Sequence, residues 1–250
     1  MRVHLLEIKY EFLKALRLPA YVIPTLLFPV GFYLFFSTAF GGRAAGSSTV
    51  ATYLIGTYGT FGVMAAAFFG FGVSIAIERG QGWLEAKRTT PMPISAYFVA
   101  KTAMAMAFSL IVVLLLMTAG VVKGGVQLSF AQAATMLGIL VAGSSVFCAL
   151  GLVFGFFAGP NSAAPLINMV FLPMSFLSGL WVPVHQLPQA LQKFAHWLPP
   201  YHLSQLALRV IGADRGESIG GHVLALAAFG AIFSALAYAG YRRDEGKLYG

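Results

Sequence analysis

Six long apolar stretches alternate with shorter polar stretches along the 250 residues of the chain. An α-helix rises 1.5 Å per residue, so about 20 apolar residues cross the roughly 30 Å hydrocarbon core of a membrane. The pattern therefore predicts an all-α integral membrane protein that forms a single domain over residues 1–250. Its six predicted transmembrane helices are residues 21–40, 49–77, 102–122, 131–157, 164–182 and 222–241.

Residues 1–19 show a different pattern, in which apolar side chains recur every three or four residues and charged side chains fall largely between them. The apolar positions are Leu5, Ile8, Phe12 and Leu16. This spacing predicts an amphipathic helix that lies in the membrane interface and ends at Pro19. A signal peptide is the alternative. It is disfavoured because the next apolar stretch is longer than the roughly 7–15 residues of a signal core, and because acidic residues precede it.

Two of the predicted spans carry further local signals. Residues 49–77 are rich in glycine and alanine, which let membrane helices approach closely. We therefore expect this span to pack within protein rather than against lipid. Ser129 and Gln132 have the spacing of a capping box at the start of the fourth span. The end of that span holds two overlapping G-x-x-x-G patterns, at Gly151, Gly155 and Gly159.

Residues 183–221, between the fifth and sixth spans, form neither an apolar span nor a hydrophilic loop. Four prolines cut this segment into short pieces, and apolar residues recur every three or four positions within it. The composition predicts short re-entrant helices that dip into the membrane face. Trp181, Trp197 and Tyr201 are expected to anchor them at headgroup depth.

The same segment contains His185, His196 and His202, which are candidate metal ligands by residue type. Their spacings of eleven and six residues match no zinc motif, and no carboxylate or thiol lies close to them in the sequence. Interfacial histidines with an apolar body and a wet tip are therefore the favoured interpretation. Cys148, inside the fourth span, is interpreted as a buried structural thiol.

Composition and charge agree with a membrane protein. Hydrophobic residues make up 58% of the chain and charged residues only 10%, against roughly a quarter charged in soluble domains. The net charge of +8 could indicate nucleic-acid binding, but the basic residues are spread over short loops. Eleven of the 16 Lys and Arg residues fall in the amino-terminal, 78–101 and carboxy-terminal segments. The positive-inside rule therefore predicts cytoplasmic termini for a multi-pass protein of the cell (inner or plasma) membrane.

The predicted spans contain no Asp, Glu, Lys, Arg or His well inside their boundaries. A charge at the bilayer centre costs about 2.5–3.5 kcal/mol even on lenient scales, so a retained charge usually handles an ion or a proton. The absence disfavours a secondary carrier, a channel with a charged ring and a membrane enzyme with acid–base pairs. Asn168 and Ser175 in the fifth span could line a substrate path, but a hydrogen bond between helices is the favoured interpretation.

Residues 78–101 are the densest charged segment, and apolar spans lie on both sides of it. Glu78, Gly82 and Glu85 are spaced i, i+4 and i+7, which puts them on one face of a short helix. The segment thus predicts a cytoplasmic helix across the mouth between the second and third spans. This helix is either a solvated connection or a docking element for a soluble partner. The sequence has no G-x-x-x-x-G-K-[ST] loop to hold nucleotide phosphates.

This segment resembles the signature of the ABC-2 type transporter permeases. The matching positions are Glu78, Arg79, Gly82, Leu84, Glu85, Arg88, Thr90 and Pro91. A second similarity, between the last two spans, involves Phe176, Ser178, Gly179, Pro183, Leu187, Pro188, Tyr201, Leu208 and Arg209. The resemblance covers nearly the whole chain. It departs from the family pattern at residues 86–88, where the family often has an apolar residue in the middle.

The resemblance implies a permease subunit that pairs with a second permease chain, as a homo- or heterodimer. It also implies two copies of a separate P-loop ATP-binding subunit, which would bind ATP and Mg²⁺. The chain itself would then need no cofactor and would not be an enzyme. ATP hydrolysis would drive export of an amphipathic, drug-like, lipid-like or glycan substrate. An ATP-independent secondary transporter or channel is the alternative function, and a membrane enzyme or an assembly factor is a third.

The resemblance also implies two groups of site residues and no catalytic or metal-binding residue. The ATPase-coupling residues are Glu78, Arg79, Gly82, Leu84, Glu85, Arg88 and Pro91. The outer-gate residues are Ser178, Gly179, Pro183, Leu187 and Pro188.

Overall fold

The computed structural model describes residues 2–45, 48–89 and 93–246, which are largely helical. The helices are α1 (Arg2–Leu16), α2 (Pro19–Val22), α3 (Phe28–Phe40), α4 (Val50–Ala67), α5 (Ser74–Gly80), α6 (Trp83–Arg88), α7 (Ile94–Lys123), α8 (Phe130–Phe157), α9 (Ala163–Leu177), α10 (Gln189–Ala195), α11 (Pro199–Arg209) and α12 (Ile219–Gly246). The remaining elements are the π-helical turns η1 (Ile23–Leu27) and η2 (Phe68–Val73), the 3-10 turn η3 (Val184–Gln186), and the paired two-residue strands β1 (Ala44–Ala45) and β2 (Ser48–Thr49).

Within the described residues, five continuous helical segments are long and apolar enough to cross a membrane, which confirms an all-α membrane protein. They are Pro19–Phe40, Val50–Gly80, Ile94–Lys123, Phe130–Phe157 and Ile219–Asp244. In place of the predicted fifth span, 164–182, the structure has the helix α9, which contains only 15 residues. At 1.5 Å per residue α9 is about 22 Å long, which is less than the hydrocarbon core. The prediction therefore placed the carboxyl end of this helix too late in the sequence.

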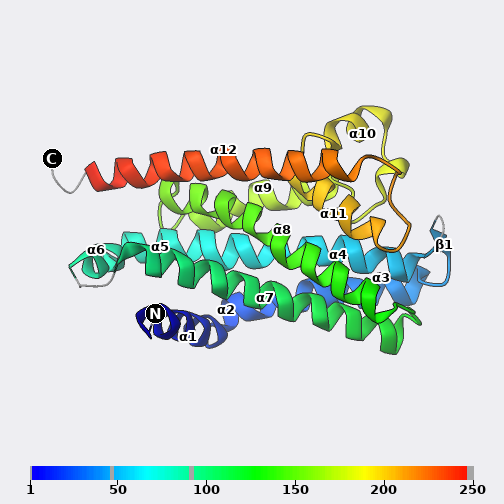
Figure 1. Ribbon diagram of the computed structural model, residues 1–250, viewed down its shortest axis with the longest axis horizontal. Coiled ribbons are helices and arrows are strands. Elements are labelled where there is room, and N and C mark those ends of the chain that lie inside the picture. Colours follow the sequence, from blue (N-terminus) through cyan, green and yellow to red (C-terminus); the bar gives the residue numbers. More distant parts are fainter. Residues whose placement is uncertain (1, 46–47, 90–92, 247–250) are drawn as a thin grey trace.

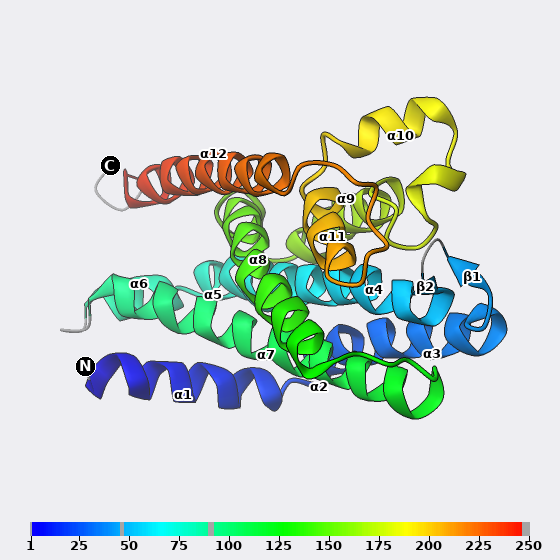
Figure 2. The same cartoon turned by 45° about the vertical axis from the view of Figure 1, so that its right-hand side comes forward.

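The long helices run side by side and have two distinct ends (Figure 1). The helix α1, the short helix α6 and the last turns of α12 lie together at one end, which we call the terminal end. The helix α10 and the strand β1 lie at the opposite end, which we call the α10 end, and Figure 2 shows the same division from another side. The helices α6 and α10 therefore lie toward opposite ends of the bundle.

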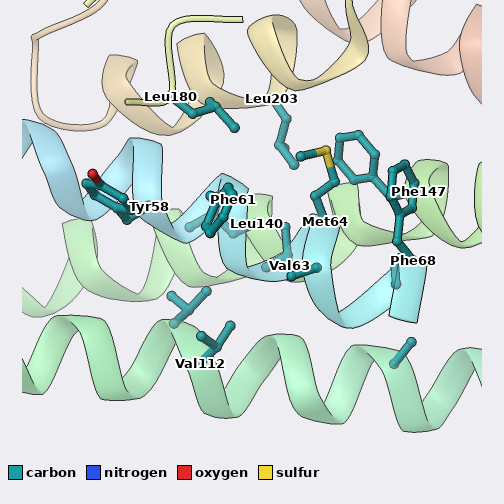
Figure 3. Packing of buried hydrophobic residues seen from close by; sticks show 14 of the residues in the cluster. Tyr58, Phe61, Val63, Met64, Phe68, Val112, Leu140, Phe147, Leu180 and Leu203 are labelled. Carbon is teal, nitrogen blue, oxygen red and sulfur yellow. The ribbon is translucent and has the colours of Figure 1, made fainter. Parts of the chain in front are cut away.

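The second span lies at the centre of the bundle, as its small residues predict. Its most apolar 18-residue window is 78% buried, whereas the corresponding windows of the other four spans are between 17% and 44% buried. Figure 3 shows side chains of α4 and η2 meeting Val112 of α7 and Leu140 and Phe147 of α8. The backbones of η2 and α8 approach closely where Gly72 faces Gly151. Close packing of small residues thus replaces the hydrophobic effect as the source of association.

The fourth span begins as the sequence predicts. Ser129 Oγ accepts a hydrogen bond from the backbone N–H of Gln132, and the Gln132 side chain accepts one from the Ser129 backbone N–H. This reciprocal pair satisfies two N–H groups that the first turn of a helix leaves without partners. The capping box is confirmed, and so is the burial of Cys148 within the same helix.

The amino-terminal helix α1 packs along one side of the bundle. It runs alongside the first half of α7 (Figures 1 and 2), with the rings of Phe12 and Phe108 5.5 Å apart. Leu5 and Leu16 of the predicted apolar stripe remain exposed, whereas Glu11 is buried against the protein. Glu11 is buried because it has an ionic partner on another helix.

Candidate functional site

The polar segment 78–101 does not form the single short helix that the spacing predicted. The second span continues through α5 to Gly80, and Gly82 then adopts a left-handed conformation with φ of 75°. A conformation of this kind costs little only for glycine, and it turns the chain before α6 begins. Glu78 and Glu85 therefore do not share one helix face.

Glu78 points into the protein rather than into solvent, and only 6% of the residue is exposed. Its Oε1 atom lies 2.7 Å from Nζ of Lys101 and also pairs with Lys14. Its Oε2 atom accepts a hydrogen bond of 2.5 Å from the hydroxyl of Tyr97. The carboxylate is therefore fully engaged by side chains of α1 and α7. Direct docking of Glu78 to a partner is inconsistent with this geometry.

Glu78 belongs to a larger group that joins α1, α5, α6 and α7, which we call the polar cluster. Its members are Glu7, Glu11, Lys14, Glu78, Lys87, Tyr97 and Lys101. Three carboxylates meet three ammonium groups, so the formal charges balance. Buried charges are tolerated when they are paired and hydrogen-bonded in this way.

Two contacts show how tightly the cluster is organised. Lys14 Nζ contacts Glu78, and although burial lowers the pKa of Lys14, the hydrogen bond and charge of Glu78 raise it to a larger extent. Lys14 therefore stays charged at neutral pH. Lys87 pairs with Glu7 and also lies 4.7 Å from the centre of the Tyr97 ring, within the range of a cation–π interaction.

The sequence contains a signal for this cluster, which is spread over three segments. Glu7 and Glu11, Ser74 and Glu78, and Tyr97 and Lys101 are each four residues apart, so each pair lies on one face of its helix. Which faces meet is decided by the packing of helices that are far apart in the sequence. The partners of Glu78 on α1 and α7 could therefore not be assigned from spacing.

The short helix α6 has a buried side and an exposed side. Leu84 is 3% exposed and packs into the main hydrophobic core, whereas Trp83 is 58% exposed and Glu85 is exposed beside it. An exposed tryptophan on a helix that is anchored from behind is typical of interaction surfaces. Arg88 ends α6, but its side chain, and Thr90 and Pro91 entirely, lie outside the described residues.

Arg79 connects three segments at the terminal end. Its guanidinium donates to the carbonyl oxygen of Ala158 at 2.7 Å and to that of Phe156, both at the carboxyl end of α8. It also lies 3.2 Å from Asp244 near the end of α12. These donors satisfy carbonyl groups that the last turn of a helix leaves without partners. Arg79 thus holds helices together and does not face outward.

The predicted outer-gate residues lie together where α9 ends. Ser178 is buried, and Gly179 has a φ of 77°. A Cβ atom at Gly179 would collide with the Val184 side chain, so glycine is required there for two reasons. Pro183 and Pro188 precede η3 and α10 respectively, while Leu187 is buried between them. The structure therefore brings these residues into one compact corner at the α10 end.

A second polar group at the α10 end corrects the expectation for the histidines. Glu217 Oε1 lies 3.0 Å from His196 Nε2 and accepts a 2.8 Å hydrogen bond from the Tyr201 hydroxyl. The Nδ1 atoms of His202 and His222 are 2.9 Å apart. The idea that no carboxylate accompanies these histidines is wrong, because Glu217 reaches them from a later loop. No group of side chains with metal-binding geometry occurs among residues 2–45, 48–89 and 93–246.

The polar residues of the fifth span do not bridge helices in the described structure. Asn168 donates to the carbonyl oxygen of Ala164 at 3.1 Å, and Ser175 donates to that of Phe171 at 2.6 Å. Both bonds stay within α9. The favoured interpretation of hydrogen bonds between helices is therefore wrong for this pair, and Asn168 is exposed on the helix surface.

Comparisons with known proteins agree with this arrangement. The family model described as ABC-2 type transporter matches residues 5–211, which is most of the chain. The chain belongs to the ABC-2 type transporter family. It is also 25% identical over 236 residues to the transport permease YvfS of Bacillus subtilis (strain 168), which covers 94% of this chain and 95% of that protein. Together with the apolar helices, the ABC-2 family assignment indicates a multi-pass membrane transport subunit rather than an enzyme.

Proposed function

We propose that the chain is the permease subunit of an ATP-driven exporter. In this proposal two permease chains form the pathway, and two separate P-loop ATP-binding subunits bind ATP and Mg²⁺ and attach at the terminal end. The carrying observation is the two-sided helix α6. It presents Trp83 and Glu85 outward while Leu84 fixes it to the core.

The proposed orientation rests on charge. Eleven of the 16 Lys and Arg residues belong to the amino-terminal, 78–101 and carboxy-terminal segments, and α1, α6 and the end of α12 share the terminal end (Figure 1). Basic segments favour the cytoplasmic side of a membrane. We therefore assign the terminal end to the cytoplasm of the cell membrane, where an ATP-binding subunit has access to nucleotide.

The proposed coupling residues divide into two roles. Glu85 and the neighbouring Trp83 would touch the ATP-binding subunit, and Gly82 would set the turn that presents them. Glu78, Arg79 and Leu84 would hold α6 from behind. Arg88 and Pro91 are included among the proposed docking residues only because of the family resemblance.

The proposed gate is the corner at the end of α9. Ser178, Gly179, Pro183, Leu187 and Pro188 would form a lid over the pathway at the α10 end, opposite the proposed docking surface. The corner is closely packed, because Ser178 and Leu187 are both buried. A lid that is compact and anchored at one glycine turn can move as a unit.

The proposed substrate is amphipathic, lipid-like, drug-like or a glycan. Large apolar side chains are exposed on α3 and α9, including Phe35 and Met169. Such faces suit lipid, a second permease chain or an apolar cargo. The described side chains in the middle of the spans are mainly apolar, which favours a cargo that does not carry an unshielded charge through them.

The test is affinity purification of the tagged permease from native membranes. A P-loop ATPase is expected in the eluate, and its yield should fall at least about tenfold for Trp83→Ala combined with Glu85→Arg, because a central aromatic anchor and a charge are removed together. Gln189→Ala, an exposed change at the α10 end, is the matched control. Recovery of the permease without any ATPase, together with transport that needs no nucleotide, would contradict the proposal. A secondary transporter or channel would then be the better assignment.

A further inference from the structure

We propose that Lys101 is a positioning residue that ties α1 to the corner formed by α5, α6 and the start of α7, so that these elements move together. The mechanical consequence rests on the proposed function, because the movement is driven by a docked ATP-binding subunit. The tie itself rests only on the geometry of the polar cluster.

Lys101 uses all of its hydrogen-bonding capacity on two other helices. Its Nζ atom lies 2.7 Å from Glu11 Oε2 on α1, 2.7 Å from Glu78 Oε1 on α5 and 3.2 Å from Ser74 Oγ on α5. An ammonium group has three N–H donors, so none is left over. The residue is 1% exposed, so water cannot replace a lost acceptor.

Apolar contacts also join α1 and α7, and they carry less directional information than an ion pair. Ala15 is buried, and Phe12 packs on Phe108 with ring centres 5.5 Å apart. Apolar surfaces of this kind can slide past one another with small changes in energy. A buried ion pair has a defined geometry and can therefore fix the register of two helices. Glu11 and Lys101 supply that fixed point.

Two further ion pairs lead from the same helix to the same corner. Lys14 on α1 contacts Glu78 on α5, and Glu7 on α1 contacts Lys87 on α6. Together with the Glu11–Lys101 pair, they connect α1 to each of α5, α6 and α7. Along the backbone, α6 and α1 are separated by the whole of the first two spans. The polar cluster is therefore the short route by which a displacement of α6 reaches α1.

The tie can be tested in the permease alone. Spin labels at Lys9→Cys on α1 and Ser95→Cys on α7, both exposed positions, report the distance between the helices in a Cys148→Ala background. Glu11→Gln removes the negative charge that Lys101 meets on α1, whereas the pair between Lys101 and Glu78 remains. We expect the distance distribution to become at least about twofold wider, since α1 loses the most buried of its three ion pairs to this corner.

Two variants make this measurement specific. Arg17→Gln removes an exposed charge from the end of α1 and should leave the distribution as narrow as in the parent. Glu11→Asp keeps the charge on a shorter side chain and should give an intermediate width. A distribution in Glu11→Gln as narrow as in the parent would overturn the tie.

The mechanical role is tested in the complex with the ATP-binding subunit, trapped with ATP and vanadate. In the parent, labels at positions 9 and 189 should change their separation on trapping, and so should labels at 95 and 189. In Glu11→Gln the 9-to-189 change should fall by at least about half while the 95-to-189 change persists. Equal changes in parent and variant overturn the role of the tie. If the parent shows no change for either pair, the proposed ATP-driven movement fails and the tie is judged by the experiment on the permease alone.

Discussion

The Nδ1 atoms of His202 and His222 face each other at 2.9 Å, and both side chains are buried. One ring must donate and the other must accept. His202 Nε2 lies 2.9 Å from the carbonyl oxygen of His196, an atom that can only accept, so this nitrogen carries a proton. Neutral His202 therefore accepts at Nδ1 and His222 donates. A second proton on His202 would bring two N–H groups together and break this hydrogen bond between α11 and α12.

The first prediction is that acid loosens the α10 end. Burial lowers the pKa of His202, and the charges of His222 and His196 lower it further. Partial burial raises the pKa of Glu217, but hydrogen bonds from His196 and Tyr201 outweigh it and lower the pKa overall. Both groups bind protons more weakly when folded. Below about pH 6.5 the unfolded state therefore gains protons first on His202, and Glu217 adds to this effect only as the pH approaches 4.5. The melting temperature in detergent should drop by roughly 3–6 °C between pH 8 and pH 5.

The control for this prediction separates the buried pair from the other histidines. The charged or titratable groups around the pair are His196, Tyr201, Asp214, Arg215 and Glu217. His222→Gln keeps a donor for His202 but does not titrate, so the acid-induced drop should shrink by about half. His185→Gln changes an exposed histidine of the same segment and should leave the drop unchanged. An unaltered drop in His222→Gln would contradict the assignment.

The second prediction concerns Gly179, where α9 ends. Its left-handed backbone costs about 1–2 kcal/mol for a residue with a Cβ atom, and a Cβ atom there would also collide with Val184. Gly179→Ala should therefore lower the free energy of unfolding by roughly 2–4 kcal/mol, measured by titration with a denaturing detergent. Gly216 has the same φ of 77° with no atom within 4 Å of an added Cβ. Gly216→Ala should show the backbone cost alone, and equal losses at both sites would contradict a role for Val184.

Local features of this fold could be predicted from the sequence, and features set by distant partners could not. The capping box of Ser129 and Gln132 and the burial of the second span depend on neighbours in the sequence or on composition, and both predictions are confirmed. The end of α9 was placed too late because the turn at Gly179 depends on its contact with Val184. An apolar run alone does not reveal such a contact.

Partners that are distant in the sequence also could not be predicted at the candidate sites. The burial of Glu11 could not be predicted, because a charged side chain on an amphipathic helix is normally solvated. Its partner Lys101 is 90 residues away in the sequence. Glu217 was overlooked as a partner of His196 for the same reason, since the two residues belong to different loops. Helix spacing predicts which residues share a face, but only packing decides which faces meet.

The third prediction tests the close approach of η2 and α8. A Cβ atom at Gly72 would lie 2.8 Å from the carbonyl oxygen of Gly151, which is backbone and cannot rotate away. Gly72→Ala should therefore separate the two helices locally and lower the free energy of unfolding by about 1–3 kcal/mol in detergent. Gly138→Ala is the control within α8, because no atom lies within 4 Å of its added Cβ. That change should be neutral or stabilising by about 0.5–1 kcal/mol.

The fourth prediction separates the two roles of Arg79. Its guanidinium donates to the carbonyl oxygens of Phe156 and Ala158 and also pairs with Asp244, whose side chain is 20% exposed. Arg79→Lys keeps the charge but loses the planar fork that reaches two carbonyl groups at once.

Because hydrogen bonds from a charged donor contribute about 1.5–3 kcal/mol each, Arg79→Lys should lower the free energy of unfolding by roughly 2 kcal/mol or more. Asp244→Asn removes only a partly exposed ion pair and should cost less than about 1 kcal/mol. The double variant should lose about the sum of the two single losses, since Arg79→Lys keeps the positive charge that pairs with Asp244. Detergent unfolding of the three variants measures all of these losses. A loss in Asp244→Asn as large as in Arg79→Lys would show that the ion pair, and not the helix cap, is the main contribution of Arg79.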